Sequence, residues 1–229
     1  MTENQYNTRS LNWIIWLMLA GVLVAAFFLR FWRLDTVPPG WRDDELINSL
    51  VISQHALDGD LAVYYADASG HEALYHVLNA FMLGNFGPGV PGIRWLSAIL
   101  GVASVFLTFL VGRRLYGASL GLVASAALAA SFWSLMYSRT GIRHILLPVL
   151  ALSAYLFFIR GLGIGDKVAR SSKEHWLDFS LAGVFMGLSF YSYFASRGVP
   201  LILLAFLVYV FLFERALISR YWKIGRAHV

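Results

Sequence analysis

Six apolar segments dominate the chain, and their lengths constrain its fold more than any other feature. A helix needs about 20 mostly apolar residues to cross the hydrocarbon core of a bilayer. Five segments come close to that length and the sixth is shorter: roughly Leu11–Trp32, Ile93–Val111, Ala118–Tyr137, Ile142–Ile159, Trp176–Ala195 and Val199–Phe213. The sequence therefore predicts an all-α fold, a polytopic transmembrane helical bundle of about six spans.

The composition is typical of a membrane protein and excludes several other classes. Hydrophobic residues make up 59% of the 229 residues and charged residues 14%, whereas soluble domains have roughly 45–50% and about 25%. The first apolar segment is too long for a signal-peptide core and lacks a small-residue cleavage site, so it is interpreted as a span. The chain has no cysteine, which excludes disulfides and thiolate metal sites.

The positive charges predict how the chain crosses the membrane. If the N-terminus is cytoplasmic, ten Lys and Arg residues before the last six positions fall inside and seven fall outside, and all three lysines are inside. Cytoplasmic loops carry such an excess, so the net charge of +5 indicates no nucleic-acid partner. We expect a multi-pass protein of the cell membrane, with a cytoplasmic N-terminus and an extracytoplasmic first loop.

The first loop gathers most of the acidic residues. Eight of the 13 Asp and Glu residues lie between Asp35 and Glu72. In the stretch Asp43–Leu57 apolar residues recur every three or four positions, which predicts a short amphipathic helix lying on the membrane surface. The following apolar stretch, Glu72–Phe86, is too short to cross the bilayer and is predicted to lie at the interface.

Three consecutive carboxylates, Asp43, Asp44 and Glu45, open this predicted surface helix. Acidic residues at a helix N-terminus are stabilised by the helix dipole, so a structural cap is one interpretation. A carboxylate can also act as a general base toward a hydroxyl group. Several carboxylates together can hold Mg²⁺ or Mn²⁺. The spacing alone leaves these interpretations open; the candidate metal ligands are Asp43 and Glu72.

Arginines lie on the same predicted membrane face as the acidic loop. Arg139 and Arg143 are four residues apart, and Arg197 is at the corresponding end of the fifth segment. Arginine binds phosphate oxygens through its planar fork of donors, so this set suits a lipid phosphate at headgroup level. The alternative is that each arginine only extends to anionic headgroups. His71 beside Glu72 is a further candidate contact, and one of Tyr191 and Tyr193 is predicted to line the site.

Four stretches together resemble a known family. They are RFWRLDTVPPGWRDDELINSL (residues 30–50), GHEALYHVL (70–78), SRTGIRHILLPVL (138–150) and YSYFASRGVPLIL (191–203). Their order and spacing resemble membrane glycosyltransferases of the GT-C fold, in the superfamily of protein O-mannosyltransferases and aminoarabinose transferases (glycosyltransferase family 39-like). Ala73 stands where that family usually has proline, so the local turn is expected to differ.

The resemblance implies an activity and a set of site residues. Such enzymes move a sugar from a polyprenyl-phosphate carrier to a hydroxyl of a protein, glycan or lipid at the extracytoplasmic face, usually with inversion. By this resemblance Asp44 is the catalytic base, and Glu45, His71 and Glu72 are its neighbours near a divalent cation. Arg139, Arg143 and Arg197 are the candidates for binding the carrier phosphate.

Family members are longer than this chain, so residues 1–223 are expected to be the N-terminal part of a GT-C transmembrane domain, inactive if alone. Residues 224–229 can be back-translated into a common sequencing-adapter sequence, which predicts a non-native tail. Two rival functions remain: a transporter or flippase of an anionic lipid-linked substrate, which would keep its charges near the bilayer midplane, and a non-catalytic membrane scaffold.

Overall fold

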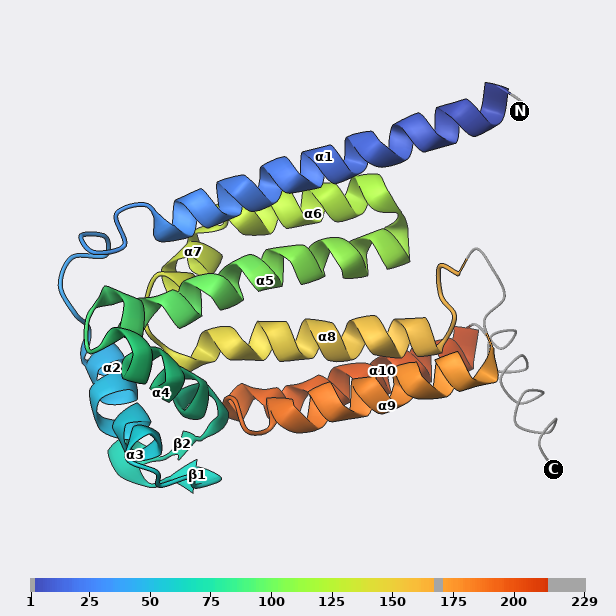
Figure 1. The fold of residues 1–229 in the computed structure, drawn as a ribbon. Coiled ribbons are helices and arrows are strands. Elements are labelled where there is room, and N and C mark those ends of the chain that lie inside the picture. Colours follow the sequence, from blue (N-terminus) through green and yellow to red (C-terminus); the bar gives the residue numbers. More distant parts are fainter. Residues whose placement is uncertain (1–2, 167–170, 214–229) are drawn as a thin grey trace.

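The computed structural model describes residues 3–166 and 171–213, and these form a helical bundle with one small hairpin (Figure 1). The α-helices are α1 (Glu3–Phe31), α2 (Asp43–Leu46), α3 (Ser53–Leu57), α4 (Leu74–Phe86), α5 (Val90–Tyr116), α6 (Ala118–Ala130), α7 (Phe132–Ser138), α8 (Leu146–Gly161), α9 (Ser172–Ser189) and α10 (Gly198–Phe213). The described residues also form shorter elements. There is one π-helical turn, η1 (Ile47–Ile52), and there are three 3₁₀ turns, η2 (Asp67–Ser69), η3 (Arg143–Ile145) and η4 (Phe194–Arg197). The two strands are β1 (Tyr64–Tyr65) and β2 (His71–Glu72). The predicted all-α fold is confirmed; the predicted tail, residues 224–229, lies outside the described residues.

The described residues contain four helices long and apolar enough to cross a membrane, and five if a bent pair is counted as one span. The four are Trp13–Phe31, Val90–Tyr116, Arg143–Gly161 and Phe194–Phe213. This is fewer than the six spans expected from the sequence. The fifth predicted segment is not counted as a span because its helix, α9, contains three charged residues near its start: Lys173, Glu174 and Asp178.

The third predicted span is a broken helix. A single helix was expected over Ala118–Tyr137, but α6 and α7 meet at Ser131 and are bent by 61°. Ser131 has extended backbone angles, so the helical hydrogen bonds are interrupted there. The side chain of Arg30, from the end of α1, donates to the carbonyl of Ala129 and to Oγ of Ser134, one on each side of the break. These contacts offset the lost backbone hydrogen bonds.

The boundaries of α9 differ from those predicted by hydrophobicity, because hydrogen bonds of polar side chains set both ends of the helix. Ser171 and Glu174 form a reciprocal capping box, so the helix begins several residues before the expected start at Trp176. At the other end, Ser189 and Ser192 donate from their hydroxyls to backbone carbonyls, and the chain turns there rather than at Ala195.

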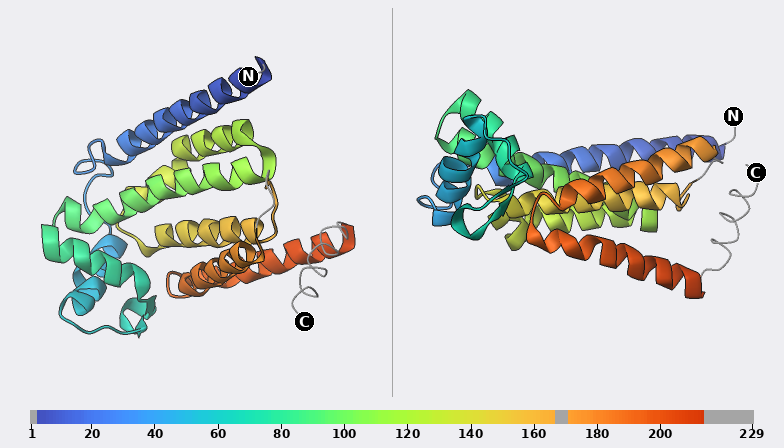
Figure 2. Two further views of the ribbon diagram at one scale, coloured as in Figure 1. Left: turned by 45° about the vertical axis from the view of Figure 1, so that its right-hand side comes forward. Right: turned by 90° about the horizontal axis from the view of Figure 1, so that it is seen from below.

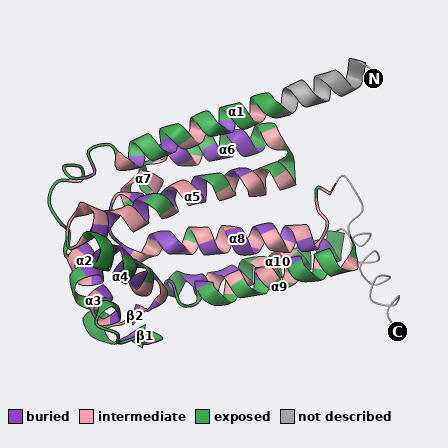
Figure 3. Cartoon of the chain, in the orientation of Figure 1, coloured by how far each residue is buried: buried purple, intermediate pink, exposed green. Residues whose placement is uncertain are grey.

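The long helices pack side by side and leave apolar faces outward, as lipid-facing helices do. Figure 3 shows many exposed residues along α1, and most residues of α10 are exposed as well. Where α5 and α6 cross, Gly112 and Gly121 let the backbones approach closely: a Cβ added at Gly112 would lie 2.8 Å from Cα of Gly121. Small residues at helix contacts are typical of membrane bundles, where close packing replaces the hydrophobic effect between helices.

One end of the bundle carries a separate layer of short elements. The expected helix over Asp43–Leu57 is confirmed as the continuous run α2–η1–α3, and α4 has 13 residues, too few to cross a bilayer. Ile52 and Ala56 pack against Ala80 of α4, which fixes the two helical segments together. Figures 1 and 2 show this layer beside the end of α1, the start of α5 and the junction between α7 and α8. The acidic loop is therefore held against that end of the bundle.

Candidate active site

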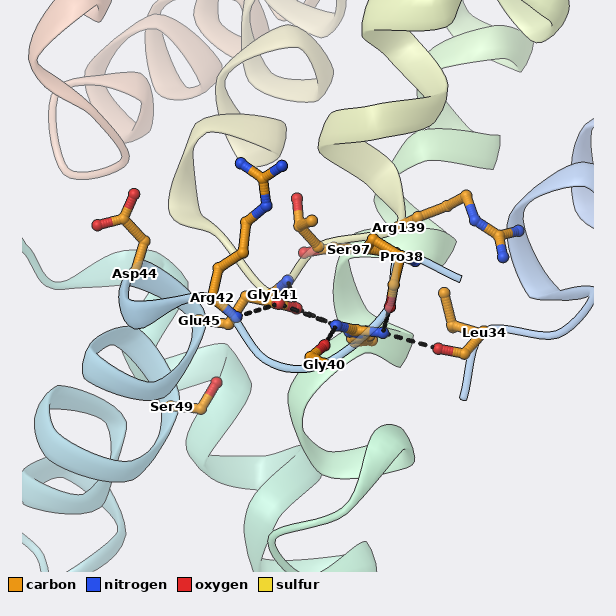
Figure 4. A network of polar contacts seen from close by, with 12 residues as sticks. Leu34, Pro38, Gly40, Arg42, Asp44, Glu45, Ser49, Ser97, Arg139 and Gly141 are labelled. Atoms are coloured by element: carbon orange, nitrogen blue, oxygen red, sulfur yellow. Dashed lines mark hydrogen bonds and ion pairs between the residues drawn. The ribbon is translucent and has the colours of Figure 1, made fainter. Parts of the chain in front are cut away.

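A buried ion pair holds the acidic loop in place. Nε of Arg94, near the start of α5, donates to Oε1 of Glu45 at 2.7 Å, and its Nη2 donates to Oε2 at 2.9 Å. The side chains are 1% and 0% exposed. The arginine also donates to the carbonyls of Leu34, Pro38 and Gly40, so one guanidinium fixes the whole segment between α1 and α2 (Figure 4).

The Glu45 carboxylate joins this loop to a third segment of the chain. Its Oε1 accepts from the backbone N–H of Gly141, and its Oε2 accepts from the backbone N–H of Arg42, the residue before α2. Gly141 has to be glycine here, since a Cβ would lie 2.4 Å from the carbonyl oxygen of Ile93. Both oxygens of Glu45 are thus fully used within the protein. The prediction that Glu45 is catalytic stays untested, and these contacts favour a role in positioning the loop.

Asp44 is the exposed carboxylate of the acidic triplet that faces the other polar groups. Its charge acts on the side chains of His71, Arg143 and His144, which come from β2 and η3. Figure 4 shows its carboxylate turned away from the Glu45 network. Asp43 is exposed as well, but it is not among the charges that shift the pKa of these groups. Of the two aspartates, Asp44 is therefore the one placed at the site.

The hairpin β1–β2 places Glu72 next to Arg143. Its two strands pair antiparallel, with Tyr64 opposite Glu72. Nη1 of Arg143 lies 3.8 Å from Oε2 of Glu72 and donates to the carbonyl of Gly70 at 3.1 Å. Because 3.8 Å is beyond hydrogen-bond length, the two side chains attract each other without saturating each other. Arg143 thus keeps donors for a ligand.

Two aromatic rings complete this group of residues. The guanidinium of Arg143 lies 5.7 Å from the ring centroid of Tyr193, and the ring of His144 lies 4.1 Å from it. Of the two tyrosines left open by the sequence, these contacts favour Tyr193, which lies beside Arg143 and His144. Tyr191 is 45% exposed and contributes its carbonyl, which accepts from the N–H of Leu74 at 2.9 Å.

His71 lies in the site but is buried, and it is held by a second histidine. Nδ1 of His71 is 3.2 Å from Nε2 of His76, whose Nδ1 is 3.0 Å from the carbonyl oxygen of Asn48. A carbonyl only accepts, so neutral His76 donates to Asn48 and accepts from His71. Burial, followed by the charge of Arg143, lowers the pKa of His71 to about 4. Burial lowers the pKa of His76 to about 3.

The low pKa of His76 predicts that the protein loses stability in acid. Between pH 6.5 and about 3 the unfolded chain binds a proton at this residue and the folded chain does not. Stability is therefore complete above pH 6.5 and falls by a few kcal/mol as the pH is lowered toward the folded pKa. Thermal midpoints measured from pH 7 to pH 4 in detergent check this. His76→Gln is expected to give a shallower slope, and identical slopes would contradict the assignment.

Arg139 is brought to the same end of the bundle but not to this group. Its guanidinium donates to the carbonyls of Leu29, Trp32, Arg33 and Val37, which include the free carbonyls at the end of α1. Figure 4 shows it extending to the opposite side of the Glu45 network from Asp44. The prediction that Arg139 binds the carrier phosphate stays untested, and these contacts favour a structural role.

Arg197 is exposed at the start of the last predicted span. Its guanidinium lies 4.5 Å from the ring centroid of Phe194. Within the described ranges its recorded side-chain contact is this one with Phe194, and Glu72 is paired with Arg143 instead. Arg143 and Arg197 belong to the turns just before α8 and α10, and Figure 1 shows both of these helices starting at the same end of the bundle. The position of Arg197 suits contact with a headgroup phosphate at the membrane surface.

The predicted metal ligands do not form a ready-made cation site. Within residues 3–166 and 171–213, no group of three or more His, Asp or Glu side chains is arranged to hold a metal ion. Asp43 is exposed, and Oε2 of Glu72 is buried next to Arg143, whose charge would repel a cation. These contacts do not favour a divalent cation at Asp43 and Glu72, and the predicted metal role stays untested.

Arg94 and His76 are the positioning residues that sequence reasoning missed. A signal for Arg94 was present: a charged residue in the first turns of a long apolar helix needs a buried partner, and the acidic triplet offers one. His76 gave no comparable signal, because a histidine in an apolar helix is usually an ordinary hydrogen-bonding residue. Its partner Asn48 is 28 positions away in sequence.

The fold and the site define a class of protein: a multi-pass helical membrane protein with an acidic and arginine-containing site at one end of its bundle. Residues 75–227 match the family of dolichyl-phosphate-mannose-protein mannosyltransferases, and the chain belongs to this family. No curated protein and no solved structure matches it significantly. The family is one of membrane glycosyltransferases that use polyprenyl-phosphate-linked sugars. The matched segment contains Arg139, Arg143 and Arg197 and begins after Glu72, so Asp44 rests on the resemblance and the geometry.

Proposed function

We propose that the chain transfers a sugar from a polyprenyl-phosphate carrier to an acceptor hydroxyl, with inversion and with Asp44 as the base. The observation that supports this most is the grouping of Asp44, Glu72 and Arg143, which are far apart in sequence, at one end of a bundle of this family. A base and a phosphate-binding cation side by side are what an in-line displacement at a glycosyl phosphate requires.

The proposed reaction proceeds in one step. Asp44 takes the proton of the acceptor hydroxyl, and that oxygen attacks the anomeric carbon from the face opposite the phosphate. The bond between the anomeric carbon and the phosphate oxygen breaks, and polyprenyl phosphate leaves with its electron pair. Arg143 stabilises the negative charge that develops on the leaving phosphate, and Arg197 binds the same phosphate from the membrane surface.

The site is proposed to face the extracytoplasmic side, with the N-terminus in the cytoplasm. The supporting observation is the charge distribution, because all three lysines fall on the other side of the predicted topology. Figure 1 shows α2 and the starts of α8 and α10, which follow the turns with Arg143 and Arg197, at the end of the bundle opposite the N-terminus. Acceptors at that face include the hydroxyls of proteins, glycans and lipids; the family description favours a protein acceptor.

A comparison of two arginines tests the donor site. Arg143→Gln is expected to raise the KM for the polyprenyl-phosphate sugar by about tenfold or more, because a charge-assisted contact to phosphate is lost. Arg139→Gln should instead lower the thermal midpoint, because the carbonyls at the end of α1 lose their donors. Transfer of a radiolabelled sugar in membrane extracts gives KM, and unfolding in detergent gives the midpoint. An equal rise of KM in Arg139→Gln, with an unchanged midpoint, would return Arg139 to the phosphate site.

The positions of the buried charges support a transporter less well than a glycosyltransferase. A transporter for an anionic lipid would place ionisable groups near the bilayer midplane, on broken helices. The buried Arg30 is next to the last residue of α1, and Arg94 lies in the first turns of α5, so both are near one membrane face. The break between α6 and α7 is filled by Arg30 rather than left open to a substrate.

A further inference from the structure

Two buried polar atoms beside Arg143 lack the partner that such atoms normally have. Nδ1 of His144 and Oε2 of Glu72 are closed off from solvent and have no hydrogen-bond partner among the described residues. Buried polar side-chain atoms are nearly always paired with protein, water or ligand. Both side chains adjoin Arg143: the Glu72 oxygen is 3.8 Å from its Nη1, and His144 is the next residue in the chain.

The imidazole of His144 is held in a fixed orientation. Its ring centroid lies 4.1 Å from that of Tyr193 and 5.8 Å from that of Tyr137, so aromatic rings from two different segments pack against it. The charges of Arg143, Asp44 and Glu72 all act on this ring, which places it inside the candidate site. A ring positioned in this way can direct a nitrogen atom at a bound group without first losing rotational freedom.

We propose that His144 contacts substrate and that, together with Glu72, it binds one alcohol hydroxyl. A hydroxyl both donates and accepts. The carboxylate of Glu72 can only accept, and Nδ1–H of His144 can donate. A single hydroxyl between them would give each atom the partner that it lacks. This inference rests on the proposed function, in which hydroxyls occur on both the sugar of the donor and the acceptor.

The charges around the pair favour a hydroxyl over an ionic group. Glu72 is compensated by Arg143, so little net negative charge remains to attract an ammonium group. A carboxylate oxygen cannot donate a hydrogen bond to a phosphate oxygen, which leaves the phosphate to the free donors of Arg143 and to Arg197. The Glu72–His144 pair therefore binds the hydroxyl-bearing part of the substrate.

Binding measurements separate the two sources of the hydroxyl. The full chain carrying Asp44→Asn, which is expected to bind without turnover, is placed in nanodiscs and titrated with polyprenyl-phosphate mannose and with polyprenyl phosphate lacking the sugar. Adding His144→Phe, which keeps a ring against Tyr193, is expected to raise the Kd of the first probe about tenfold and leave the second unchanged if the sugar is bound. If the acceptor is bound, neither Kd changes, and His144→Phe alone raises the KM for a Ser/Thr peptide.

A rescue and a matched control distinguish contact from packing. His144→Asn places an amide nitrogen near the position of Nδ1 and should restore part of the affinity that Phe removes. His55→Phe, a histidine of the same loop region paired with Asp60 and Asp67, should change neither Kd nor KM. Equal weakening of both probes, or unchanged Kd and KM in His144→Phe with an intact thermal midpoint, would overturn the proposal. If Asp44 proved not to be the base, the effect of His144→Phe on the Kd would still test the binding of the hydroxyl.

Discussion

Replacing Asp44 by Asn is expected to lower the rate of sugar transfer by about a thousandfold while donor binding stays nearly unchanged. General base catalysis contributes factors of about 10²–10⁴, and Asn keeps the size of the side chain but cannot take the proton. The carboxylate is exposed at the site, so its loss leaves no buried charge unpaired and should not unfold the protein. Transfer of radiolabelled sugar from a polyprenyl-phosphate donor measures the rate, and titration with the donor measures binding.

Asp43→Asn is the matched comparison, because it removes the same charge one residue away. Asp43 is exposed and, unlike Asp44, is not among the charges that shift the pKa of His71 or Arg143, so transfer should be retained. A comparable loss in both variants would show that the charge of the loop matters rather than a base at position 44. A loss in Asp43→Asn that excess Mg²⁺ or Mn²⁺ reverses would support the predicted metal site instead. Full transfer by Asp44→Asn would remove Asp44 as the base.

Breaking the Glu45–Arg94 pair is expected to have the largest effect on stability of any substitution considered. Removing one partner of a buried ion pair costs about 3–5 kcal/mol, because the other charge stays buried without compensation. In Glu45→Gln the backbone N–H of Gly141 and Arg42 also lose a charged acceptor. Arg94→Met releases three loop carbonyls in addition. Thermal unfolding in detergent should show a lower midpoint for each variant, with transfer lost because Asp44 is no longer held.

A double-mutant cycle shows whether the pair acts as a unit. Glu45→Gln combined with Arg94→Met should destabilise by much less than the sum of the single effects, since neither charge is then left unpaired. Asp166→Asn, which breaks the ion pair with Arg114 at the opposite end of the bundle, serves as the control, and its effect should add independently. Strict additivity between Glu45 and Arg94 would contradict the role assigned to their contact.

Several predictions made from the sequence are confirmed by the structure, because they depend only on the local pattern of apolar residues. The apolar lengths gave the membrane bundle, the spacing over Asp43–Leu57 gave a helix, and the shortness of Glu72–Phe86 excluded a span. The break at Ser131 was not predictable in this way. Hydropathy averages over the segment, and the contact that stabilises the break comes from Arg30, about a hundred residues earlier.

The roles of the individual charged residues required the tertiary structure. The sequence predicted that the acids of the first loop and several arginines lie at one end of the bundle, because loop composition and helix length are local properties. Only the folded chain decided which charged groups pair. Glu45 forms its ion pair with Arg94, and Arg139 donates to carbonyls at and after the end of α1. Arg143 lies near Glu72 and Asp44 instead. Partner choice among like charges depends on distances between segments that are far apart in the chain, and no local pattern encodes those distances.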